Sequence, residues 1–275
     1  MNKLLYLFIA AGAVILFSCK KELDIDYGES GPYYVIQGDI TDEPAKVIIT
    51  KTRNVNDSVK GKSLPGAEVV ISDDNGKSEH LAYGSDGYYR SPSGWKGETG
   101  RTYTMKVKID GKEFAASSTM REAVNLDSIK FIWMSSAGMK MMLLKYWSSF
   151  PKTSELSFTH ARMYKNGKFY RSNMGKHISK ERLTSEAMLG CTTEKKMDEN
   201  DPEDADVILF DNDKIHLELW TIDANVYNYF FSLQVGRNNA TNPLTNLSGG
   251  AVGYFSAHHV CTIDTVFMRK DVKDF

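Results

Sequence analysis

The order of hydrophobic and polar residues predicts short β-strands over most of the chain. Residues 103–109 alternate apolar and polar side chains with a period of two, which predicts a strand with one buried and one solvated face. Asn75-Gly76 follows another apolar run and predicts a hairpin, because this pair tolerates the positive φ of a tight turn. About seven such strands in about 90 residues, with turns every 8–12 or so, are typical of an immunoglobulin-like sandwich.

Strand-like runs continue in the second half of the chain, together with two candidate helices. Residues 179–189 start with Ser179 as an N-cap and stop before Gly190, which predicts a short helix. A second helix is predicted from about Ala224 to Val235, with Asp223 as its cap. Its apolar face is formed by residues at helical spacing, namely Val226, Tyr229, Phe230 and Leu233.

We therefore expect a mainly β protein with two domains. Residues 32–121 are predicted to form an immunoglobulin- or transthyretin-like β-sandwich, and residues 65–71 with Asp86-Gly87 resemble its carboxypeptidase-regulatory variant. Residues 122–275 are predicted to form a second β-rich domain with one or two short helices. Modules that resemble the first domain usually bind or space other parts of a protein and rarely catalyse.

The first eighteen residues have the layout of a secretory signal peptide. Lys3 supplies a positive start, and Leu4 to Phe17 is an apolar run that is shorter than the roughly 18–20 residues of a permanent membrane span. Leu16-Phe17-Ser18-Cys19 resembles the bacterial lipobox, which implies that Cys19 is lipidated and becomes the first mature residue. An ordinary secretory peptide cut near Ser18 and a short anchor helix are the alternatives.

Residues 19–31 then form a charged tether. A single acyl chain holds a protein only marginally, so stable anchoring requires the several chains that bacterial lipoproteins carry. Lys20 stands where retention in the inner membrane would favour Asp, which implies transport to the outer membrane. The lysine and acidic residues after Cys19 resemble tethers that favour surface display, but a solvated linker remains an equal alternative, so the surface and the periplasmic face both stay open.

Composition and charge exclude some partners and leave the cysteines undecided. The net charge of −1 provides no basic field to attract nucleic acid. Besides Cys19 the chain has Cys191 and Cys261, which would pair as a disulfide in an oxidising compartment or remain as two buried thiols. No Cys/His spacing indicates zinc.

Candidate catalytic and metal-binding chemistry is sparse. The acidic stretch 198–206 offers oxygen ligands for Ca²⁺ but lacks the register of an EF-hand loop, so a solvated loop is the plainer interpretation. His258-His259 could bind metal together with His216, although adjacent strand residues point to opposite faces. No Gly-x-Ser-x-Gly motif frames a nucleophilic serine. We therefore expect no cofactor and no catalytic site.

Aromatic and glycine-rich loops are the predicted contact surface, because binding residues concentrate on loops held by a rigid scaffold. The candidate binding residues are Trp95, Asn242, Asn246 and Tyr254. For Trp95, a half-buried packing position is the plainer and favoured interpretation.

Several motifs together resemble the DUF4249 lipoproteins of Bacteroidetes over nearly the whole mature chain. These motifs are the signal with Cys19, Gly38-Asp39-Ile40, Pro65-Gly66-Ala67-Glu68-Val69, Asp127-Ser128-Ile129, the helix 225–233, and the block from Asn242-Pro243 to Gly253-Tyr254-Phe255. The family carries no assigned reaction. Asp57-Ser58-Val59 also resembles an O-glycosylation motif of exported Bacteroidetes proteins, which makes Ser58 a candidate modification site.

The resemblance implies an accessory role in uptake, since members are commonly encoded beside TonB-dependent receptors. We expect a non-catalytic lipoprotein, held at the outer membrane by its lipid anchor, that captures or gates a ligand for such a transporter. A structural or adhesive surface lipoprotein without a transporter is the alternative, and a hydrolase is less favoured. The sequence identifies neither the ligand nor the oligomeric state.

Overall fold

The computed structural model describes residues 32–52, 61–136, 138–152, 156–178, 184–193, 207–236 and 243–274. The predicted signal peptide and tether, Cys19, Ser58, Asn242 and the acidic stretch 198–206 lie outside these residues.

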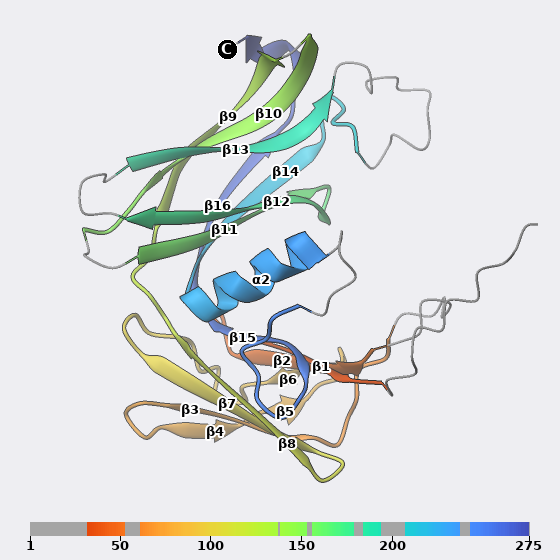
Figure 1. Ribbon diagram of the computed structural model, residues 1–275, viewed down its shortest axis with the longest axis vertical. Helices are drawn as coiled ribbons and strands as arrows, with labels where there is room; N and C mark the ends of the chain where they lie inside the picture. The colour runs from red at the N-terminus through yellow and green to blue at the C-terminus, as the bar shows by residue number, and fades with distance from the viewer. Residues whose placement is uncertain are drawn as a thin grey trace, which may run out of the picture. The chain divides into compact units, whose positions relative to one another are not determined.

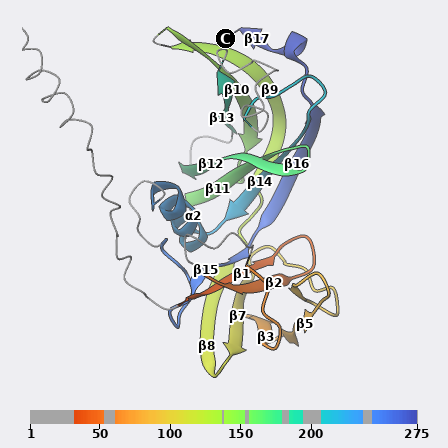
Figure 2. The same cartoon turned by 90° about the vertical axis from the view of Figure 1, so that its right-hand side faces the viewer.

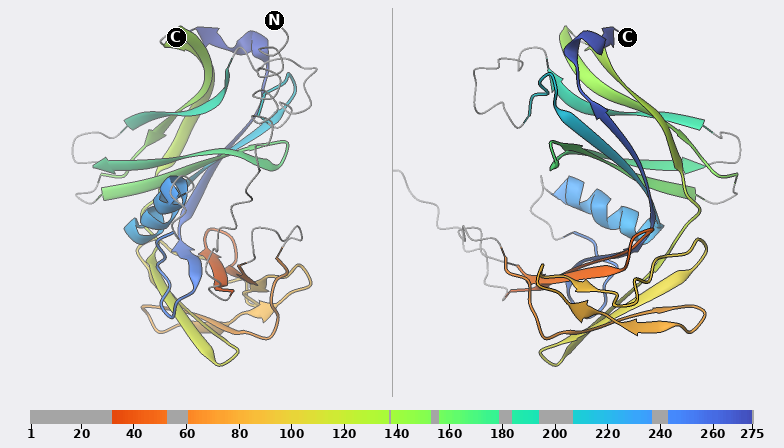
Figure 3. Two further views of the ribbon diagram at one scale, coloured as in Figure 1. Left: turned by 45° about the vertical axis from the view of Figure 1, so that its right-hand side comes forward. Right: turned by 180° about the vertical axis from the view of Figure 1, so that it is seen from behind.

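Two sheets form a first β-sandwich (Figures 1 and 3). One sheet has the order β15-β1-β2-β6-β5. Its strands are β15 (Val252–Ala257), β1 (Tyr34–Ile40), β2 (Lys46–Lys51), β6 (Tyr89–Arg90) and β5 (Ala82–Tyr83). The other sheet has the order β4-β3-β7-β8 and contains β4 (Ser78–His80), β3 (Glu68–Asp73), β7 (Thr102–Ile109) and β8 (Lys112–Thr119).

The core of this sandwich follows from the period-two pattern of its strands. Ile36 and Val47 from one sheet pack with Ile71 and Met105 from the other, and all four are fully buried. Three further alternating positions of β7 are also buried. The hairpin predicted at Asn75-Gly76 is confirmed between β3 and β4, where Gly76 has a φ of 87°.

The strand β15 comes from the C-terminal part of the chain and completes this first sandwich. It pairs in parallel with β1, and Gly253 lies opposite Ile36. Gly253 has a φ of 120°, and a Cβ at this position would overlap the carbonyl oxygen of Ile36. Glycine is therefore required at position 253 both by the backbone conformation and by the close approach of the strands.

Two more sheets form a second sandwich. One has the order β13-β10-β9-β17, with β13 (Thr184–Thr193), β10 (Met139–Ser149), β9 (Asn125–Ser136) and β17 (Lys273–Asp274). The other has the order β12-β11-β14-β16, with β12 (Lys168–Ile178), β11 (Leu156–Lys165), β14 (Lys214–Ile222) and β16 (His259–Val266). The 3-10 helix η2 (Arg269–Asp271) precedes β17. The mainly β prediction is thus confirmed.

Helix α2 (Ala224–Gly236) lies between the two sandwiches, against β11 and β12 on one side and β15 on the other (Figures 1 and 2). The side chain of Asp223 caps it as predicted, because Oδ1 accepts hydrogen bonds from the backbone amides of Asn225 and Val226 at 2.9 Å. Val226 and Tyr229 are buried, whereas Leu233 of the predicted apolar face is 37% exposed. Among the described residues no helix is long and apolar enough to cross a membrane.

The prediction of a helix over residues 179–189 is wrong where the structure describes it. Thr184–Thr193 forms β13, which pairs antiparallel with β10. Leu189 and Cys191 face the second core at a strand period of two, so cross-strand pairing and burial override the helix propensity of the segment. Residues 207–210 form a turn and irregular structure before β14.

Candidate functional site

One face of the sheet β12-β11-β14-β16 concentrates polar and aromatic side chains. The odd-numbered residues of β11 and β14, such as Met163 and Leu217, fill the second core. The even-numbered residues therefore project from the opposite face. In register, Arg162 of β11 lies opposite Glu218 of β14, and His160 lies opposite Trp220. We define the Arg162 face as Arg162, Tyr164, Phe169, His216, Glu218 and Trp220.

The guanidinium of Arg162 is held among aromatic rings. Its carbon lies 4.3 Å from the ring centroid of Trp220, 5.6 Å from Phe169 and 5.7 Å from Tyr164. These distances fall within the range of cation–π contacts, which stabilise a partly desolvated cation. Within the described part of the chain no carboxylate lies within ion-pair distance of this guanidinium. Stacking against the aromatic rings thus positions Arg162, and no described carboxylate neutralises its charge in a direct ion pair.

Glu218 occupies the position beside Arg162 and is itself held by neighbouring side chains. Its Oε2 accepts a hydrogen bond from the indole Nε1 of Trp220 at 2.8 Å and from the Tyr164 hydroxyl at 3.3 Å. His216 Nε2 lies 3.5 Å from Oε1, and His216 Nδ1 lies 2.8 Å from Asp264. The face therefore presents a fixed cation and a fixed carboxylate side by side on a rigid sheet.

Two buried histidines lie next to Trp220. The His258 ring stacks on the Trp220 ring at 4.3 Å, and His160 contacts the same ring edge-on at 5.7 Å. Burial, together with the charge of Arg162, lowers the pKa of each histidine to about 3. Both rings are consequently neutral at neutral pH.

Asp39 reaches the same region from β1 of the first sandwich. Burial raises the pKa of its carboxyl to about 6, although Lys46, a hydrogen bond from Tyr254 and the charge of Arg162 act in the opposite direction. The Arg162 charge thus influences groups from both sandwiches. The polar cluster lies where the two sandwiches meet.

Three buried polar atoms in this region make no hydrogen bond within the described part of the chain. They are Asp39 Oδ1, His160 Nδ1 and Arg162 Nε. Each of the three side chains therefore keeps unused hydrogen-bonding capacity in this region. Such a concentration of unsatisfied polarity is typical of functional sites and not of sheets selected for stability alone.

Helix α2 covers one end of this face and leaves the other end open. Phe230 of α2 contacts the rings of His160 at 4.4 Å and Trp220 at 6.1 Å. Toward the opposite end, His216 joins Lys214 and Asp264 in lining a depression of about 460 Å³. A ligand on the Arg162 face could therefore extend into this depression.

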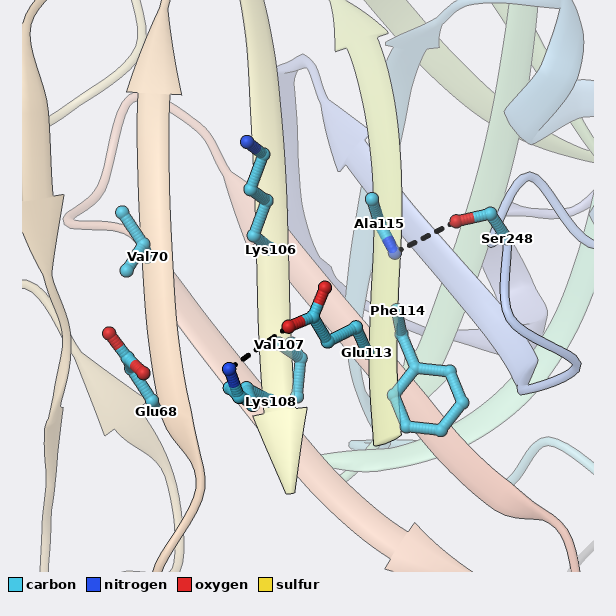
Figure 4. Close-up of a pocket in the computed structure, with 9 residues that line it drawn as sticks. All are labelled: Glu68, Val70, Lys106, Val107, Lys108, Glu113, Phe114, Ala115 and Ser248. Atoms are coloured by element: carbon cyan, nitrogen blue, oxygen red, sulfur yellow. Dashed lines mark hydrogen bonds and ion pairs between the residues drawn. The ribbon is translucent and has the colours of Figure 1, made fainter. Parts of the chain in front are cut away.

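A larger depression of about 580 Å³ lies on the first sandwich (Figure 4). Among its charged groups, Lys108 pairs with Glu113 at 3.0 Å, Glu68 lies 3.8 Å from His80, and Lys106 projects from the same strand as Lys108. Ser248 closes one side by bonding to the backbone of Ala115. Because these groups are of mixed sign and stand on a solvated strand surface, where ion pairs contribute little, we place the candidate site at the Arg162 face.

The described residues that were predicted to form a contact surface are instead held by packing or by hydrogen bonds within the fold. Trp95 is only 5% exposed and packs against Tyr103 in the first core, so its prediction as a contact residue is wrong and the packing alternative holds. Asn246 uses its amide to bond both backbone groups of Phe255, at 2.8 and 3.0 Å. Tyr254 is buried beneath α2 against Tyr229 and near Asp39.

The three histidines proposed as metal ligands do not converge. His258 bonds Ser256, His259 bonds Asp42 and Thr99, and His216 bonds Asp264. Among the described residues no group of three His, Cys, Asp or Glu side chains is arranged to hold a metal ion.

The two cysteines are free thiols on different sheets. Cys191 lies buried in β13 and Cys261 lies half-buried in β16, so the structure has the free-thiol alternative and not the disulfide. Burial raises the pKa of Cys191 to about 12 and also raises the pKa of Cys261.

Sequence reasoning missed Arg162 and Glu218, although a signal was present. Along β11 the residues Phe158, His160, Arg162 and Tyr164 alternate with small and apolar ones. A period-two row of aromatic and charged residues marks a sheet face that is neither ordinary core nor ordinary solvated surface.

Fold and site together define a protein of two β-sandwiches joined at an arginine-centred polar and aromatic cluster. Residues 20–264 match the family described as Domain of unknown function (DUF4249), and the chain therefore belongs to this family. No curated protein matches the chain in sequence.

Proposed function

We propose that this chain is an outer-membrane lipoprotein, acylated at Cys19, that captures or gates a ligand for a TonB-dependent transporter without transforming it. The observation that carries the binding role is the Arg162 face. There a guanidinium and a carboxylate are fixed next to each other by aromatic neighbours, and no described carboxylate pairs directly with the guanidinium.

This arrangement favours recognition because its groups are already oriented. Binding sites gain affinity when side chains are held in place before the ligand arrives, so that little rotamer entropy is lost on binding. Arg162 and Glu218 sit on paired strands, and Trp220 contacts both. Buried polar atoms of Arg162 and His160 that have no hydrogen-bond partner among the described residues lie beside them.

The anchor and the partner rest on the sequence. The lipobox-like segment ending at Cys19 supports acylation, and Lys20 after it supports transfer to the outer membrane. The family's association with genes for TonB-dependent receptors supports the transporter as the partner.

Co-purification tests the proposed partner. An affinity tag on the C-terminus of the native protein, solubilised from envelopes in a mild detergent, should recover a TonB-dependent receptor in stoichiometric amount. The Cys19→Ser variant should enter the soluble fraction and lose the receptor. Recovery of an intact lipoprotein with no such receptor would refute the transporter role, and an unacylated wild-type protein would refute the anchor.

A structural or adhesive role is the second candidate, and exposed apolar side chains favour it. Phe231, Leu233 and Val235 at the end of α2 are 48%, 37% and 45% exposed, as expected for a protein contact. In a deletion strain this role predicts a loss of attachment or envelope integrity with unchanged nutrient uptake. The transporter role predicts impaired nutrient uptake in the same strain, with attachment and envelope integrity unchanged.

A further inference from the structure

The chemistry of the Arg162 face also indicates which class of ligand it fits. Phe169, at the start of β12, is 52% exposed, and its ring meets Tyr164 edge-on at 6.0 Å. An exposed aromatic ring held by its neighbours provides a flat apolar platform. A ligand with an apolar ring face could stack there, next to the polar groups of Arg162 and Glu218.

The hydrogen-bonding groups beside this platform are of opposite kinds. The guanidinium of Arg162 can only donate, and the carboxylate of Glu218, when ionised, can only accept. They are cross-strand neighbours in register, so one ligand can reach both. A hydroxyl group donates and accepts, and a pair of adjacent hydroxyls on a ring can satisfy a fixed donor and a fixed acceptor together.

The charges decide between a neutral and a charged ligand. Arg162 and Lys214 supply two cations along the face and its adjoining depression, and Glu218 and Asp264 supply two carboxylates. Asp39 adds further negative charge near Arg162. An anionic ligand would meet these carboxylates and a cationic ligand would meet Arg162, whereas a neutral polyhydroxylated ligand meets neither repulsion.

The depression beside the face argues for an extended ligand. The sheet face continues through His216 into the space lined by Lys214 and Asp264, so a chain of linked rings has room to extend along the face in that direction. A small molecule that needs an enclosed cavity would leave most of its surface in water here.

Resting on the proposed ligand-capturing function, we propose that the Arg162 face binds a neutral oligosaccharide or polysaccharide. One sugar ring stacks on Phe169, and its adjacent hydroxyls accept from Arg162 and donate to Glu218. Further sugar units lie along His216 toward Asp264.

Affinity electrophoresis tests this with the detergent-solubilised mature lipoprotein. The gels contain one soluble polysaccharide each: dextran, xyloglucan, galactomannan or arabinan as neutral probes, and polygalacturonate as an acidic probe. We expect at least one neutral probe to retard the wild-type protein and polygalacturonate to leave its mobility unchanged. Phe169→Ala should raise the dissociation constant for the retarding probe at least tenfold, and Glu218→Gln should raise it severalfold.

Phe231→Ala is the matched control, because Phe231 is similarly exposed but stacks on Tyr227 of its own helix and is not part of the Arg162 face. It should change the dissociation constant less than twofold. Thermal unfolding of each variant separates loss of binding from loss of fold, and a folded Phe169→Ala variant that binds like wild type overturns the proposal. Failure of all four neutral probes, or stronger binding of polygalacturonate, overturns it as well.

The outcome can be separated from that of the proposed transporter role. If the tagged protein recovers a TonB-dependent receptor but no neutral probe binds, only the ligand class fails. If a neutral probe binds through Phe169 but no receptor is recovered, the oligosaccharide site stands and the transporter role fails.

Discussion

Ser118 and Asp223 lie 105 positions apart in the chain, yet the Ser118 hydroxyl donates to the Asp223 carboxylate at 2.5 Å. The same hydroxyl accepts the backbone N–H of Ala257 in β15 at 2.9 Å, and Asp223 also caps helix α2. One pair of side chains thus ties β8 and β15 of the first sandwich to the helix that packs on the second. This contact fixes the helix that covers one end of the Arg162 face.

Replacing Asp223 with Ala should destabilise the protein by about 2–5 kcal/mol. The substitution removes a helix cap, worth about 0.5–2 kcal/mol, and a buried hydrogen bond to a charged group, worth about 1.5–3 kcal/mol. Urea unfolding followed by circular dichroism measures the change. Asp271→Ala, at an exposed position in the short helix η2, serves as the control and should shift stability by less than about 0.5 kcal/mol.

Gly253→Ala should be far more damaging than Gly250→Ala, although both glycines have a positive φ, of 120° and 81°. A Cβ at position 250 meets no atom within 4 Å, so only backbone strain of about 1–2 kcal/mol is added there. At position 253 the Cβ would overlap the Ile36 carbonyl and force β15 away from β1. We expect a loss of at least about 3 kcal/mol in urea unfolding, and equal losses for the two variants would contradict the close approach.

Features that depend on a few neighbouring residues could be predicted from the sequence. The turn at Asn166-Gly167 joins β11 and β12 with φ values of 50° and 78°, because this pair adopts the left-handed region at low cost. Asp223 caps α2 as its sequence position indicates. The mainly β class follows from alternation that each strand displays by itself.

Features that depend on distant pairing could not be predicted. The helix-favouring composition of residues 184–189 yields to pairing with β10, and nothing local reveals that partner. The Arg162 face joins β11, β12 and β14, and Asp39 arrives from β1. Trp95 sits in a glycine-rich segment that reads as a surface loop, yet that segment folds its ring inward against Tyr103.

The two described thiols should differ in reactivity toward a maleimide. Cys191 is 3% exposed and its pKa is raised to about 12, so it carries almost no thiolate at pH 7.5. Cys261 is half-buried in β16 and should react first. Mass spectrometry should find one added label in the folded acylated protein and two in urea. Cys261→Ser should abolish the fast label, and fast labelling that persists in this variant would contradict the burial of Cys191.

Acid should destabilise the fold through His160. Its pKa falls to about 3 in the folded protein, against a model-peptide value of 6.5. Above about pH 6.5 the His160 ring is neutral in the folded and in the unfolded state, and the fold keeps its full stability. As the pH falls from 6.5 toward 3, the unfolded chain binds a proton that the folded protein does not bind, so the free energy of unfolding decreases. Between pH 8 and pH 5 this amounts to about 2 kcal/mol.

His160→Phe tests that dependence, because phenylalanine suits the aromatic surroundings of Trp220 and Phe230 and does not titrate. The variant should lose about 2 kcal/mol less stability than wild type between pH 8 and pH 5 in urea unfolding. The other titratable groups, including the buried His258, are shared by both proteins and cancel in the difference. Identical pH profiles for the two proteins would show that the ring is not held neutral.

Asp39 should act in the opposite direction, since burial raises its pKa from 3.8 to about 6. Between these values the folded protein binds a proton that the unfolded chain releases, so the cost of burying the carboxylate is complete above pH 6 and disappears on acidification. Asp39→Asn removes this cost. The free energy of unfolding of the variant, relative to that of wild type, should be higher at pH 8 than at pH 5 by about 1–2 kcal/mol. If the stability of Asp39→Asn relative to wild type does not change with pH, Asp39 is already neutralised by a direct partner. Asp42→Asn is the control for a carboxylate that is accessible to water, because Asp42 is exposed and bonds His259.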